Sequence, residues 1–149
     1  RLLRTPTTAK LFESQHKVTF FCGNSATKKR RDELTAEGAS IVQLPDDVVG
    51  RPDVTAGMQY LGTQGVNHAL IEAGPGLVTS ILAADAVDRI YWTQSNHILG
   101  SNALAAVDNL GSELANKMAI LPEKKYFQSD HRLIGDDRLV VLTKSRLKS

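Results

Sequence analysis

The sequence contains a single cysteine, Cys22, and this scarcity excludes a disulfide bond within the chain. One free thiol is typical of a protein from a reducing compartment, so we expect a cytoplasmic location. The sequence also lacks a signal-peptide pattern, and none of its apolar runs approaches the ~20 residues that a membrane-spanning helix needs. We therefore expect no membrane partner.

Charge of one sign is also scarce, because the formal net charge is only +2. Such a balance gives no electrostatic reason to expect a nucleic-acid partner. The one dense basic run, residues 28–31, has no interleaved aromatic residue and is followed by acidic residues, so we interpret it as a solvated helix face with local ion pairs. The histidines lack metal-ligand spacing, and we expect no metal site. They are His16, His68, His97 and His131.

The chain has 149 residues, which is long enough for one domain with an ordinary core. No internal repeat or linker interrupts it, so we expect a single domain over residues 1–149. The first residue is Arg1 rather than methionine, and the first six residues resemble the end of a strand that enters a turn. We expect this domain to lack its N-terminal strands.

The hydrophobic pattern predicts alternating strands and helices along most of the chain. We expect strands at residues 17–22, 41–44, 68–72 and 87–93, and helices at residues 27–37, 53–64 and 75–84. Two further strands, residues 126–133 and 138–143, flank a turn at Gly135 and form a hairpin. This order predicts an α/β fold with a mostly parallel sheet, helices on both faces, and an antiparallel C-terminal hairpin.

Residues 70–80 are the most informative segment, because an apolar run ends in a carboxylate and a small-residue turn leads directly into a helix. Backbone N–H groups at such a helix start can bind an anion. We expect Gly76, Leu77 and Val78 to offer free N–H groups, with the hydroxyls of Thr79 and Ser80 beside them. A plain strand-to-helix connection explains the same residues, since glycine and proline are common in turns.

Glu72 ends the apolar run of this segment. A carboxylate in that place is costly unless a cation, an N–H group or a ligand donor satisfies it. In an open α/β sheet the end of a strand is also where ligands bind. Contact with a ligand and pairing within the protein therefore both remain open for Glu72.

Several motifs in this order resemble the reductase domain of the bifunctional riboflavin-biosynthesis deaminase–reductase. That family shows a Glu-Gly/Ala-Gly-Pro turn, a Leu-Arg-x-Pro segment, and a closing Gly-x-Asp-x-x-Leu. The matching stretches here are Leu3-Arg4-Thr5-Pro6, Glu72-Ala73-Gly74-Pro75, Ile98-Leu99-Gly100 and Gly135-Asp136-Asp137-Arg138-Leu139. The resemblance covers essentially the whole chain and implies a dihydrofolate-reductase-like three-layer α/β/α fold. One departure is residues 93–97, which replace the family's usual apolar-Ala-Pro entry.

The resemblance also implies an activity, namely NADPH-dependent reduction of 5-amino-6-(5-phosphoribosylamino)uracil to the ribitylamino product. The cofactor supplies the hydride, so no acid–base residue need lie in this segment. Glu72 would contact the substrate, and a homodimer is implied. The implied NADP contacts are Arg1, Gly74, Pro75, Gly76, Leu77, Val78, Thr79 and Ser80. An alternative is a non-catalytic nucleotide-binding or assembly module with the same fold.

Overall fold

The computed structural model describes residues 3–13, 16–97, 99–100, 102–108 and 126–145. The chain forms two compact units, residues 1–69 and residues 70–149. Each unit is described here by itself.

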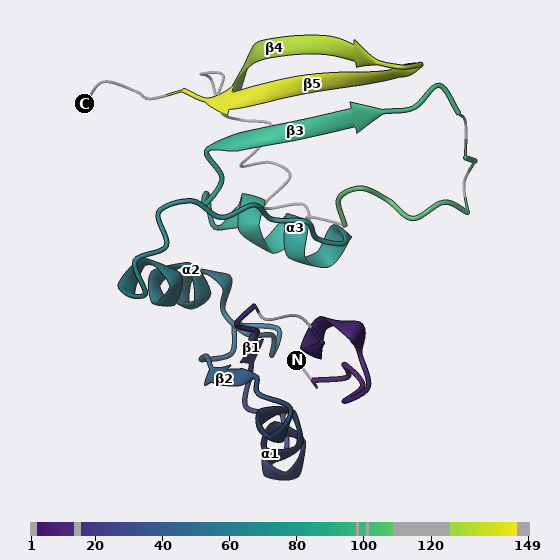
Figure 1. The fold of residues 1–149 in the computed structure, drawn as a ribbon. Coiled ribbons are helices and arrows are strands. Elements are labelled where there is room, and N and C mark those ends of the chain that lie inside the picture. The colour runs from purple at the N-terminus through teal and green to yellow at the C-terminus, as the bar shows by residue number, and fades with distance from the viewer. Residues whose placement is uncertain (1–2, 14–15, 98, 101, 109–125, 146–149) are drawn as a thin grey trace. The chain divides into compact units, whose positions relative to one another are not determined.

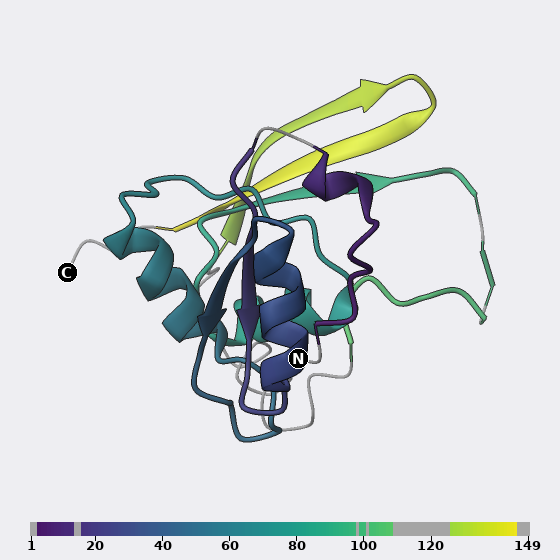
Figure 2. The same cartoon turned by 60° about the horizontal axis from the view of Figure 1, so that its bottom comes forward.

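The first unit is built around two parallel strands, β1 (Thr19–Cys22) and β2 (Ser40–Gln43), which pair Phe20 with Ile41. Helix α1 (Lys28–Ala36) connects them, and helix α2 (Val54–Thr63) follows β2. A short 3-10 helix, η1 (Lys10–Phe12), precedes β1. Figures 1 and 2 show α1 and α2 on opposite sides of the two strands.

The helix ends in this unit follow from the residues found there. The Thr27 hydroxyl accepts a hydrogen bond from the Arg30 amide and caps the start of α1, and the Asp53 carboxylate caps α2 in the same way. Gly38 and Gly65 follow the two helices with φ of +87° and +78°, a conformation that glycine adopts without strain. The predicted helix ends are therefore confirmed to within about two residues.

The alternation of side chains along β1 builds a core on each of its faces. On one face the fully buried Cys22 and Leu34 pack with Leu3, and Phe20 joins them. On the other face Phe21 makes an edge-to-face contact with Tyr60 of α2, with ring centroids 5.6 Å apart. The first unit thus has helices on both faces of a parallel pair, as the sequence predicts.

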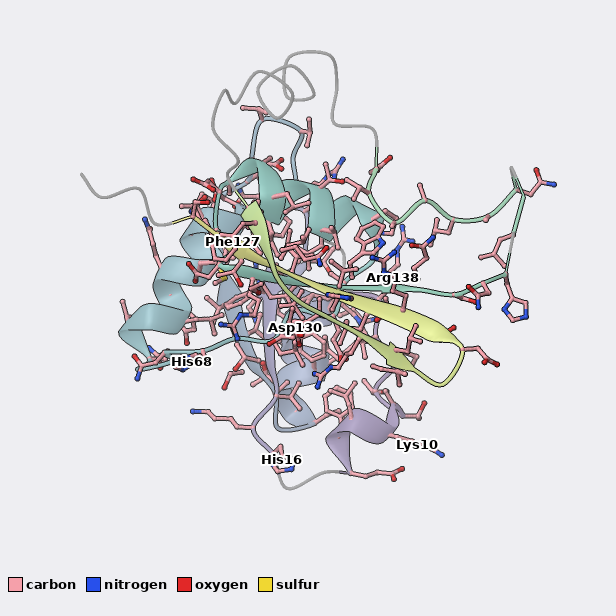
Figure 3. The ribbon with its side chains drawn as sticks, turned by 90° about the horizontal axis from the view of Figure 1, so that it is seen from above. Lys10, His16, His68, Phe127, Asp130 and Arg138 are labelled. Atoms are coloured by element: carbon pink, nitrogen blue, oxygen red, sulfur yellow. The ribbon has the colours of Figure 1, made fainter. Side chains whose placement is uncertain are left out.

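The second unit contains helix α3 (Pro75–Ala83) and three antiparallel strands. These are β3 (Arg89–Gln94), β4 (Tyr126–Ile134) and β5 (Asp137–Lys144), and β5 lies between the other two. Figure 1 shows the three strands side by side, and in Figure 3 the labelled residues Phe127 and Asp130 lie on β4 and Arg138 on β5. The predicted hairpin is confirmed, with Gly135 at φ +61° in its turn.

The expected mostly parallel sheet differs from what the described residues form. They contain one parallel strand pair, whereas β3 joins β5 in an antiparallel pair. The predicted strand at residues 68–72 is wrong, because the structure assigns no strand there and each of these residues is exposed. An apolar run becomes a strand only when another strand hydrogen-bonds to it, and within the described residues none does.

Candidate functional site

The turn before α3 places a short row of backbone groups at the start of the helix. Gly74 is the N-cap residue, and Pro75 follows in the first turn, where its missing N–H has no helical partner to lose. Within the described part of the chain, the N–H groups of Gly76 and Leu77 have no hydrogen-bond partner. Two adjacent free donors at a helix N-terminus are the groups that bind a phosphate oxygen.

The expectation of a third free donor at Val78 is wrong. The Val78 N–H donates to the Gly74 carbonyl at 3.1 Å, which is the first hydrogen bond of the helix. An α-helix leaves only the N–H groups of its first turn unpaired, and this bond shows where the regular pattern begins. The cradle at the start of α3 therefore has two free donors.

The hydroxyls of Thr79 and Ser80 are turned toward the helix itself. Thr79 Oγ1 donates to the Pro75 carbonyl at 2.8 Å, and Ser80 Oγ donates to the Gly76 carbonyl at 3.0 Å. Such bonds to the carbonyl four residues earlier are common for these residues in helices. Each hydroxyl proton must leave its carbonyl before it can donate to a phosphate.

Thr79 has a second contact that the sequence does not suggest. The Asp108 N–H donates to Thr79 Oγ1 at 2.9 Å, so the segment that ends at residue 108 reaches the first half of α3. Thr79 thereby links the helix to this segment, 29 residues later in the chain. Its place in the structure is a positioning role within the second unit.

Glu72 lies two residues before the N-cap of α3 and is exposed. Within the described residues its carboxylate has neither a hydrogen bond nor an ion pair. Its oxygens are therefore free to accept hydrogen bonds from a ligand near the cradle. Arg1, the other expected contact, lies outside the described residues.

A second group of polar residues lies in the first unit, where β1 and β2 end. Both oxygens of Asp46, which follows β2, lie 3.3 Å from the backbone nitrogen of Asn24, which follows β1. Gln43 Nε2 donates to the Asn24 side chain at 2.8 Å, and Arg31 donates to Gln43 Oε1 at the same distance. Sequence reasoning missed this group, although polar residues after two successive parallel strands are a signal for it.

Two other kinds of site were searched for in the described part of the chain. No group of three or more histidine, cysteine, aspartate or glutamate residues there could hold a metal ion. No helix there is both long and apolar enough to cross a membrane.

The family model of the RibD C-terminal domain matches residues 1–132. The chain belongs to this family. The match spans both compact units, including the cradle and the group at the ends of β1 and β2. No curated protein matches the chain.

Solved structures of this family share the fold. Two structures of RibD from Acinetobacter baumannii, form 1 and form 2, are each 21% identical to the chain with a TM-score of 0.69. They cover 95% and 96% of this chain, while the chain spans 35% of their length. A pyrimidine reductase-like protein from Corynebacterium diphtheriae is 15% identical, with a TM-score of 0.69, and 97% of this chain covers 58% of it. At such identities the likeness shows the RibD reductase fold alone.

Proposed function

We propose that this chain is part of an NADPH-dependent reductase of 5-amino-6-(5-phosphoribosylamino)uracil in riboflavin biosynthesis. Membership of the RibD C-terminal family supports a pyrimidine reductase, and the free N–H pair at the start of α3 supports the cofactor. The observation that carries the proposal is the place of Glu72, an unpaired carboxylate two residues before that helix N-cap. An anion site and a substrate anchor thus occur in one segment.

The residues of the cradle fit the phosphate part of the cofactor. The N–H groups of Gly76 and Leu77 would donate to the pyrophosphate, and the positive end of the α3 dipole would add to that attraction. Bound NADPH supplies the hydride for the reduction. The chain's own task is to orient cofactor and substrate, for which the helix end and the Glu72 carboxylate are fixed reference points.

Glu72 would bind the substrate through its polar hydrogens. The pyrimidine and ribose parts of the proposed substrate carry N–H and O–H donors, and a carboxylate accepts from both kinds. Hydrogen bonds to a charged acceptor are stronger than neutral ones. Glu72 would therefore contribute to substrate position rather than to proton transfer. We propose in addition that the protein is cytoplasmic and acts as a homodimer.

A non-catalytic nucleotide-binding module is the second candidate, and the loop after β3 favours it. There Ser95 and His97 hydrogen-bond to each other at 2.8 Å, and Asn96 Nδ2 donates to the Asp136 carbonyl at 2.8 Å. Polar contacts thus hold a loop in which the family pattern has apolar residues followed by proline. A loop changed in this way would still allow a nucleotide to bind at α3.

Turnover separates the two candidates. The full-length protein should oxidise NADPH, followed by absorbance at 340 nm, only when the phosphoribosylaminouracil substrate is present. The ribitylamino product should appear in equal amount. Binding of NADPH with no oxidation at any substrate concentration would support the module instead.

A further inference from the structure

The ends of β1 and β2 hold a carboxylate against the backbone of the neighbouring strand. Asp46 follows β2, and both of its side-chain oxygens face the Asn24 N–H at 3.3 Å. A Cβ added to Gly23 would collide with Asp46 Oδ1, and its next neighbour would be Asp46 Cγ at 3.0 Å. Only a glycine at position 23 leaves room for this carboxylate at the end of β1.

No basic side chain within the described residues neutralises Asp46. The nearest arginine in this group, Arg31, donates to Gln43 Oε1 at 2.8 Å, and Gln43 in turn donates to Asn24. The ion pairs of the described chain involve other acids, namely Asp32, Glu33 and Asp85. Asp46 therefore keeps its negative charge and acts only as a hydrogen-bond acceptor.

The position of this carboxylate is chemically specific. In a parallel β–α–β unit, ligands bind outside the carboxyl ends of the strands. A carboxylate at the end of the second strand accepts hydrogen bonds from ribose hydroxyls and repels a phosphate on that ribose. Asp46 ends the second strand of such a unit, formed by β1, α1 and β2, and it comes 23 residues after Gly23.

We propose that Asp46 is a specificity-determining residue that opposes the 2′-phosphate of the bound dinucleotide. It does so by occupying the Asn24 N–H with a negative charge, so the protein accepts NADH nearly as well as NADPH. The inference rests on the proposed function, because it assumes that a nicotinamide dinucleotide binds to this protein. It concerns the first unit alone and does not depend on the cradle at α3.

The direct test compares the two dinucleotides in the full-length protein by isothermal titration calorimetry. Asp46→Asn keeps the shape of the side chain and removes its charge. We expect the ratio of the NADPH and NADH dissociation constants to shift about tenfold toward NADPH, which is the effect of removing one like charge about 5 Å from a phosphate in solvent. Asp53→Asn is the matched control, since asparagine also caps helices and the variant removes the same charge from the cap of α2.

A second variant reaches the same carboxylate from its neighbour. Gly23→Ala places a methyl group where Asp46 Oδ1 lies and should move the carboxylate away from the Asn24 N–H. We expect a shift of the dissociation-constant ratio in the same direction as for Asp46→Asn. In the double variant the second change should add little, because the carboxylate is already absent. Thermal unfolding confirms that each variant is folded.

The outcomes separate this inference from the proposed function. If both dinucleotides bind and neither variant changes the ratio of their dissociation constants, the specificity role is wrong while the proposed function stands. A wild-type protein that binds NADPH more than 100-fold tighter than NADH also overturns the role of Asp46. If neither dinucleotide binds, the proposed function fails and the inference fails with it.

Discussion

Arg30 Nε donates to the carbonyl oxygen of Leu3 at 2.8 Å and so connects α1 to the start of the described chain. The same guanidinium donates to the Thr5 carbonyl and, at 2.5 Å, to Glu33. Leu3 has a φ of +50°, which a side chain rarely adopts, and it is nevertheless 6% exposed. The hydrogen bonds from Arg30 compensate for this backbone conformation.

The first prediction concerns this contact. Arg30→Ala leaves two carbonyls without their donor and should lower the free energy of unfolding by about 2 kcal/mol, measured by urea denaturation. Lys28→Ala on the same helix is the control, because the Lys28–Asp32 pair is largely exposed and should cost less than about 0.5 kcal/mol. Equal losses in the two variants would show that Arg30 is merely a surface residue.

The second prediction concerns the stability of the second unit at alkaline pH. Burial raises the pKa of Tyr126 above its ordinary value of 10.0, and the charges of Asp85 and Asp88 raise it further. The folded state therefore keeps the phenol proton more firmly than the unfolded state. This contribution to stability is complete below pH 10 and disappears as the pH rises through the folded-state pKa.

Tyr126→Phe tests this pH dependence. At pH 7 the variant should lose about 1 kcal/mol, because the hydroxyl no longer donates to the Val87 carbonyl at 2.8 Å. Between pH 9 and pH 11 its stability should fall less than that of the wild type in urea titrations. A wild-type and a variant curve that run parallel over this range would contradict the raised pKa.

The third prediction concerns Glu72. Glu72→Gln removes the charge from an acceptor that has no partner in the described residues, and kcat/KM for the pyrimidine substrate should fall about 100-fold. The dissociation constant of NADPH should stay within about twofold. Glu37→Gln, which changes an exposed carboxylate in the other unit, should leave both values unchanged. Equal losses for substrate and cofactor would contradict the assigned role.

The fourth prediction concerns the cradle. Gly76→Val adds a branched side chain beside the free N–H groups of α3 and should raise the NADPH dissociation constant about tenfold by displacing a phosphate oxygen. Gly62→Val places the same side chain on α2, where a Cβ meets nothing within 4 Å. This control should cost helix stability and leave the cofactor affinity unchanged. An unchanged affinity in the Gly76 variant would exclude the cradle.

Local chemistry made much of the fold predictable from the sequence. Thr27 and Gly38 mark the ends of α1, and Gly135 marks the turn of the hairpin, because each acts on residues a few positions away. The start of α3 was predictable for the same reason, since Pro75 suits the first turn of a helix. Family membership also followed from motifs in their order along the chain.

Contacts between distant residues had to come from the tertiary structure. An apolar run at residues 68–72 predicts a strand, yet pairing decides whether one forms, and these residues have no paired neighbour in the described chain. The basic run at residues 28–31 resembles a solvated face, and Lys28 does pair there with Asp32, but Arg30 binds backbone carbonyls 25 and 27 residues away.

The sequence by itself determined the helix ends, the hairpin and the segment from Glu72 to Ser80, because capping, turn formation and the first turn of a helix depend on neighbouring residues. The tertiary structure alone decided that Val78 is already bonded, that Thr79 and Ser80 face their own helix, and that Asp46 lies against Gly23. Those facts depend on hydrogen-bond geometry and on strand pairing. Neither is encoded in the local order of residue types.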